Sequence, residues 1–67
     1  MEHPLKKARE KKGLSQGQLA IRSGIAKATI SRLETGVITN PQTSTVLALE
    51  RALELRRGTL VFTPVAA

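Results

Sequence analysis

The chain has 67 residues, no cysteine and one histidine, and its 11 Lys and Arg against 5 Asp and Glu residues give a formal net charge of +6. This length allows one small domain, and these counts exclude disulfides, thiolate metal sites and a histidine metal site built within one chain. Because the sequence has no membrane-length apolar run and no signal-peptide core, and so short a chain rarely encloses a substrate cleft, we expect a cytoplasmic, non-enzymatic protein that binds a polyanion and needs neither cofactor nor membrane.

The positive charge lies mostly in the first half of the chain. Residues 1–36 carry eight basic and three acidic side chains, whereas residues 37–67 carry three and two. Phe62 is the only Phe, Tyr or Trp residue, which argues against proteins that stack single-stranded bases on aromatic rings. The composition therefore favours a helical protein that binds duplex DNA, with an anionic membrane surface as the second choice.

The first expected element is a helix over residues 5–12. Pro4 suits the first position of a helix, because an amide hydrogen there has no partner within the helix, and Gly13 suits the residue that ends one. Leu5 and Ala8 lie three residues apart and form its apolar face. That face is too narrow for a helix that lies on a membrane surface.

Residues 15–36 predict two short helices joined by a tight turn. Ser15 is a strong N-cap, and Gln18 three residues later completes a capping box. Gly24 ends the first helix after about two turns, and Gly36 ends the second. Two short helices joined by a turn that contains glycine form a helix-turn-helix, in which the second helix enters the major groove of DNA.

A fourth helix is expected after the loop that contains Asn40 and Pro41. Thr43 or Ser44 is the expected N-cap. Apolar residues recur at helical spacing and form one stripe: Val46, Leu47, Leu49, Ala52 and Leu53. The solvated side of the helix is expected to carry Glu50, Arg51 and Glu54.

The pattern changes after the fourth helix. Residues 58–63 are β-branched and apolar, and Pro64 stops the run, so propensity favours a strand. Leu60 and Phe62 would point to one side of it and Val61 to the other. A single strand leaves its backbone unpaired and the chain offers no second strand. We therefore expect a homodimer in which this strand pairs with its copy, with Leu60, Val61 and Phe62 at the interface.

The segment from Leu14 to Gly36 is similar to the Xre family, the helix-turn-helix domains of Cro and lambda-type repressors. The family pattern is LSQxxLAxxxGxxxxTISxxExG, and this chain reads LSQGQLAIRSGIAKATISRLETG. The loop and apolar stripe that follow extend the match to about Leu53. The resemblance implies a mainly α, lambda repressor-like bundle of four or five helices. Its DNA-binding domain would comprise residues 1–55, and residues 56–67 would form a dimerisation tail.

The sequence departs from the family pattern near its C-terminal end. Family members usually have glycine where Glu54 stands, followed by a short fifth helix with leucine where Arg57 stands. Here Arg57 and Gly58 fall in the middle of that helix, which disfavours it. The tail instead resembles HipB-type antitoxins, in which a C-terminal strand pairs between subunits. This second resemblance implies a HipA-like kinase toxin as a further partner.

The resemblance also implies which residues meet DNA bases. Family members contact base edges from the outer face of the second helix of the motif. Basic side chains there match the acceptors of guanine, and an alanine methyl matches the methyl of thymine. The corresponding residues of this chain are Lys27, Ala28 and Arg32, with Thr29 and Ser31 beside them.

Phosphate contacts and one structural pair complete the expected site. Gln16 stands at a helix N-terminus, which attracts phosphate, and the family uses this glutamine for backbone contact. Lys6 and Asn40 are further expected phosphate contacts. Arg9 and Glu34 align with a pair that bridges the first and third helices in relatives.

We therefore expect a homodimeric, sequence-specific repressor that reads a palindromic operator and serves as the antitoxin of a HipA/HipB-type pair. An alternative is a restriction-modification controller or small prophage regulator, which usually keeps the fifth helix. An alternative of another class is an interaction module that uses this fold without binding DNA. The basic recognition surface argues against that last alternative.

Overall fold

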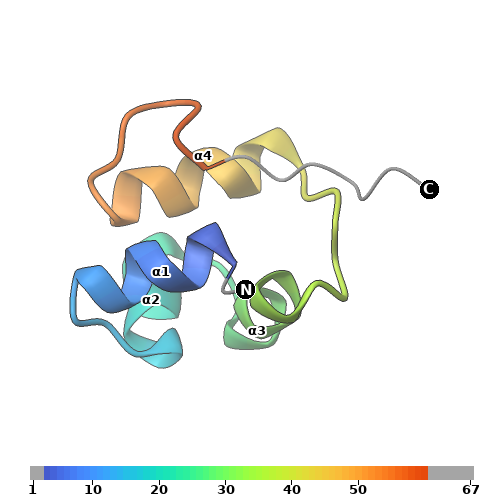
Figure 1. Cartoon of the computed structure of the whole chain (residues 1–67), viewed down its shortest axis with the longest axis horizontal. Helices are drawn as coiled ribbons and strands as arrows, with labels where there is room; N and C mark the ends of the chain where they lie inside the picture. The colour runs from blue at the N-terminus through green and yellow to red at the C-terminus, as the bar shows by residue number, and fades with distance from the viewer. Residues whose placement is uncertain (1–2, 61–67) are drawn as a thin grey trace.

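The computed structural model describes residues 3–60, and within them the chain forms four helices and no strand (Figure 1). They are α1 (Pro4–Lys11), α2 (Gln16–Ser23), α3 (Lys27–Thr35) and α4 (Thr43–Ala52). Helix α2 packs against both α3 and α4, and α1 packs against α3. Figure 1 shows α3 and α4 at opposite sides of the bundle. The expected mainly α architecture is confirmed.

The helix-turn-helix begins and ends at the residues that its local signals indicate. Ser15 Oγ accepts a hydrogen bond from the Gln18 amide at 3.1 Å, and Gln18 Oε1 accepts one from the Ser15 amide at 2.8 Å. This is the predicted capping box. Gly24 ends α2 with a φ of +75°, a left-handed conformation that glycine adopts without steric cost. The tight turn that sets α3 against α2 depends on it.

Seven apolar side chains form the core of the described residues, and every helix contributes to it. Ile30 and Leu33 bury the inner face of α3, and the expected α4 stripe supplies Leu49 and Leu53. Burying such a side chain stabilises a fold by about 1.5–3 kcal/mol. The complete set is Leu5, Leu19, Ile30, Leu33, Leu49, Leu53 and Leu60.

Helix α4 begins one or two residues earlier than expected. Its N-cap is Gln42, whose side chain makes no capping hydrogen bond, whereas the sequence pointed to Thr43 or Ser44. The Gln42 carbonyl already accepts the amide of Val46 at 3.1 Å, so the first helical turn includes both residues that were expected to cap it.

Glu50 is buried, which corrects the expectation that it lies on the solvated side of α4. Glu50 is only 2% exposed. Its Oε2 accepts a hydrogen bond from the backbone amide of Leu60 at 2.8 Å. The chain after α4 folds back over this face of the helix, so the periodicity of α4 alone does not reveal the burial.

The end of α4 carries a non-glycine residue in a left-handed conformation. Glu54 has a φ of +58°. The amide of Glu54 donates to the Arg51 carbonyl at 3.1 Å, and the amide of Leu55 donates to the Glu50 carbonyl at 2.8 Å. These two bonds form a Schellman motif, which usually places glycine at the position of Glu54. The family glycine noted above thus has a conformational reason.

The predicted strand at residues 58–63 lies partly outside the described residues. Gly58, Thr59 and Leu60 are described and form no strand, and no fifth helix follows α4 within residues 53–60. Val61 and Phe62 lie outside the described part of the chain, so the pairing of two tails stays a prediction. Leu60 packs in the core of its own chain, where it is 6% exposed.

Candidate nucleic-acid interface

The two buried residues of α3 fix which of its side chains face outward. With Ile30 and Leu33 in the core, residues four apart on the opposite side, such as Ala28 and Arg32, lie one above the other on the surface. The five residues expected to read bases divide by exposure: Lys27, Ala28 and Arg32 are exposed, whereas Thr29 and Ser31 are half-buried.

The only acidic residue of α3 is withdrawn from that surface. Glu34 is the single Asp or Glu in the helix, and its side chain is 3% exposed. Lys27 and Arg32 are therefore the exposed charged side chains of α3. The outer face of the helix is positively charged, as a surface that meets a polyanion requires.

Glu34 is held by a hydrogen-bond network that joins α1, α2 and α3. Arg9 binds it in a bidentate manner, with Nε 2.7 Å from Oε2 and one terminal nitrogen 3.1 Å from Oε1. The other terminal nitrogen of Arg9 donates to the Leu14 carbonyl at 2.7 Å. Gln16 Nε2 donates to Glu34 Oε1 at 3.1 Å. The two residues that were aligned with a bridging pair thus contact each other directly.

The network changes the proton affinity of both charged partners. Burial tends to raise the pKa of Glu34, but hydrogen bonds from Arg9 and Gln16 and the charges of Arg9 and Lys6 outweigh it and lower that pKa. The pKa of Arg9 is raised, first by its hydrogen bond to Glu34, against the opposing effect of burial. Both side chains therefore remain ionised at neutral pH.

The expected phosphate contacts are only partly brought together. Gln16 is the first residue of α2, and its side chain lies against Glu34 of α3. Lys6 on α1 is half-buried and close enough for its charge to stabilise ionised Glu34. Asn40 is exposed in the loop between α3 and α4, with no hydrogen bond to either residue. Gln16 and Lys6 therefore both lie close to Glu34 of α3, whereas Asn40 does not belong to this group.

Two apolar side chains are exposed beside the helix-turn-helix. Ile21 on α2 is 86% exposed. Val37 follows directly after Gly36 at the end of α3 and is 72% exposed. An apolar residue in a loop carries no periodic signal that separates core from surface, so the exposure of Val37 is not predictable from the sequence pattern.

The described residues offer hydrogen-bond donors rather than metal ligands. No group of three or more His, Cys, Asp and Glu side chains within residues 3–60 is placed to hold a metal ion. None of the four helices there combines the length and apolar character that a membrane span requires. The chemistry at the surface of α3 is that of an ammonium, a guanidinium, hydroxyls and a methyl group.

Comparison with known proteins places the chain in a family. A helix-turn-helix (HTH_3) family model matches residues 5–60. The HTH-type transcriptional regulator SlrR of Bacillus subtilis (strain 168) is 40% identical over 47 residues, which cover 70% of this chain and 31% of SlrR. The chain thus spans about a third of the length of that relative. No solved structure gives a significant match. The chain belongs to the Xre-like helix-turn-helix family.

Proposed function

We propose that this chain is a sequence-specific DNA-binding transcriptional regulator that places α3 in the major groove. The observation that carries this proposal is the outer face of α3, where Lys27, Ala28 and Arg32 are exposed together. The one carboxylate of the helix is turned inward and paired with Arg9. A bare carboxylate at that position would repel DNA phosphates, so the pairing keeps the binding face free of negative charge.

The side chains of this face match the donor and acceptor pattern of base edges. Arg32 and Lys27 would donate to O6 and N7 of guanine, and the Ala28 methyl would contact a thymine methyl. Thr29 and Ser31 are half-buried at the edges of the face and have hydroxyls for base or phosphate contacts. These contacts would specify sequence.

Contacts to the sugar-phosphate backbone would fix the position of α3. Gln16 stands at the start of α2, where unpaired amides and the helix dipole favour phosphate. Lys6 lies on the adjoining α1, and Asn40 lies in the exposed loop after α3. Such contacts are independent of sequence and depend strongly on salt.

The proposal includes a homodimer formed through the tail. Val61 and Phe62 would pair with the tail of a second subunit and bring two copies of α3 to the half-sites of a palindrome. Successive major grooves lie about 34–36 Å apart, which is the spacing that the dimer must supply. The β-branched composition of residues 59–63 and the absence of a fifth helix within residues 53–60 support this arrangement over the usual one in the family.

The tail favours one specific role, that of a HipB-type antitoxin. Such a protein would repress its own operon and bind a HipA-like kinase toxin in the cytoplasm. Restriction-modification controllers and small prophage regulators usually keep the fifth helix, so they fit the segment after α4 less well. An interaction module that does not bind DNA fits the exposed basic residues of α3 least.

In vitro selection from a pool of random duplexes tests the proposal. The 67-residue chain should enrich a palindromic sequence and bind it at least about 10³-fold more tightly than a scrambled duplex at the same salt concentration. A net charge of +6 is enough for weak binding to any duplex, so the ratio and not the binding itself is informative. A ratio near one at physiological salt would overturn the assignment.

A further inference from the structure

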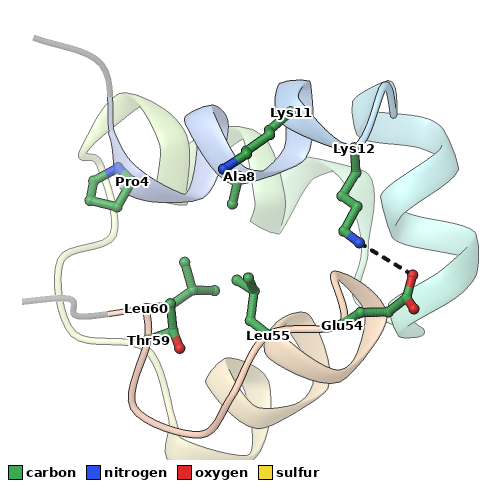
Figure 2. Close-up of a pocket in the computed structure, with 8 residues that line it drawn as sticks. All are labelled: Pro4, Ala8, Lys11, Lys12, Glu54, Leu55, Thr59 and Leu60. Carbon is green, nitrogen blue, oxygen red and sulfur yellow. Dashed lines mark hydrogen bonds and ion pairs between the residues drawn. The ribbon is translucent and has the colours of Figure 1, made fainter.

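A groove lies between α1 and the chain that follows α4, and no residue of α3 lines it. It has a volume of about 490 Å³. Figure 2 shows side chains of α1 on one wall and those of residues 55–60 on the other, with the Lys12–Glu54 ion pair of 3.4 Å across one end. Its lining is Pro4, Ala8, Lys11, Lys12, Glu54, Leu55, Thr59 and Leu60.

The floor of the groove is apolar and incompletely covered. Ala8 and Leu55 pack against the core yet remain half-buried, and Pro4 is exposed. Leu60 also lines the groove, and its side chain is buried. Water in contact with this surface is unfavourable, so an apolar side chain that filled the groove would stabilise the fold.

The sequence places an aromatic residue shortly after the groove. Leu60 lines the groove and is also the last described residue, and Phe62 follows two residues later. Two residues of chain reach at most about 7 Å from one Cα to the next-but-one. The Leu60 amide donates a hydrogen bond of 2.8 Å to buried Glu50, and this bond holds Leu60 beside the groove.

We propose that Phe62 of the same chain fills the groove between α1 and residues 55–60. In an extended tail Leu60 and Phe62 point to the same side, and Leu60 already points into the core of its own chain. A tethered segment acts at an effective concentration in the millimolar range, so the side chain from the same subunit is favoured over one from a second copy. Glu50 is then a positioning residue that anchors the docked tail.

This docking leaves the other side of the tail available. Val61 and Thr63 would face outward, and the backbone edge of the tail would stay free to pair with the tail of a second subunit. The inference concerns the packing of one chain and does not depend on DNA binding. A selection experiment that found no sequence-specific DNA binding would therefore not contradict the docking of Phe62 in the groove.

Nuclear magnetic resonance of the 67-residue chain tests the proposal directly. Phe62 is the only phenylalanine, so a ¹³C label in phenylalanine rings marks this side chain alone. We expect nuclear Overhauser contacts from the ring to the methyl groups of Ala8 and Leu55. In a mixture of labelled and unlabelled chains, isotope filtering should show that these contacts lie within one chain. Contacts only between chains would assign the groove to a second copy, and no contact with these methyl groups would show that Phe62 docks elsewhere.

Variants of the 67-residue chain supply an independent measurement. Phe62→Ala should lower the urea midpoint of unfolding more than the control Val37→Ala, which truncates an exposed valine that does not line the groove. Combining Phe62→Ala with Leu55→Ala should cost less than the sum of the two single effects, since the two side chains contact each other. Additive effects would overturn the proposal. The spectroscopic test uses the unmodified protein, so it decides even if a variant does not fold.

Discussion

Arg9 Nε lies 2.7 Å from Glu34 Oε2, and this ion pair joins the first helix to the helix that carries the exposed basic face. The two side chains are 10% and 3% exposed. The Glu34 carboxylate also accepts a hydrogen bond from the side chain of Gln16 on α2. Three helices are thus held at one carboxylate, and the orientation of α3 depends on it.

Removing one partner of this pair should destabilise the protein more than removing both. Arg9→Met or Glu34→Leu alone leaves a buried charge unpaired, which costs about 3 kcal/mol, whereas the double variant leaves no such charge. Urea midpoints of the three variants would measure the coupling. The exposed Lys12–Glu54 pair is a matched control, and Lys12→Met should change stability by less than about 1 kcal/mol. Equal, additive losses at Arg9 and Glu34 would show an uncoupled pair.

Stability should fall in acid because of Glu34. Its pKa is lower in the folded protein than the ordinary value of 4.5, so its ionised form favours folding above pH 4.5. That contribution is lost as the pH falls below 4.5 and through the folded pKa. Urea midpoints between pH 6 and pH 3 should therefore drop steeply in the natural chain and less steeply in Glu34→Gln. Identical slopes for the two proteins would contradict the shift.

Glycine at position 54 should stabilise the fold. Glu54 has a φ of +58°, and this conformation costs a residue with a Cβ about 1–2 kcal/mol. Glycine avoids that steric cost, although it loses more backbone entropy than glutamate when the chain folds. We expect Glu54→Gly to raise the free energy of unfolding by about 0.5–1 kcal/mol. Glu54→Gln removes the same contact with Lys12 but keeps the strained conformation, so it should give no gain. A gain of equal size in both variants would trace the effect to charge instead.

Arg32 should determine specificity, whereas Lys6 should determine general affinity. Arg32→Ala is expected to weaken binding to the selected operator by about 1–3 kcal/mol and to relax preference at one base pair of each half-site. Lys6→Ala should weaken operator and scrambled duplexes alike and reduce the salt dependence. Fluorescence anisotropy with both duplexes measures the two effects. The base-reading role of Arg32 is wrong if its removal weakens both duplexes equally.

A charge on the outward side of the tail should separate the subunits. In the proposed strand pair, Val61 of each chain approaches its copy, so Val61→Asp would place two like charges together. We expect this variant of the 67-residue chain to sediment as a monomer and to bind a palindrome no better than a single half-site. Val61→Thr keeps the β-branched shape and should remain dimeric. A dimer in both variants would move the interface away from the tail.

The sequence by itself determined the helices and the boundaries of the helix-turn-helix, because these depend on local signals, whereas the start of α4 has no side-chain cap and was misplaced. The Ser15–Gln18 capping box, the glycine after α2 and the spacing of Ile30 and Leu33 each concern residues within four positions of one another. The resemblance to repressor domains added the pairing of Arg9 with Glu34, which no local signal contains.

Only the tertiary structure decided the environment of residues whose partners lie on another segment. Glu50 occupies a polar position of α4 by periodicity, but it is buried because Leu60, ten residues later, returns to donate its amide. Gln16 contacts Glu34, eighteen residues away, and Glu54 is left-handed because the chain must reverse over α4. Helical periodicity predicts which face of a single helix is buried against the core. It does not predict the path of the chain after α4, and that path buries Glu50.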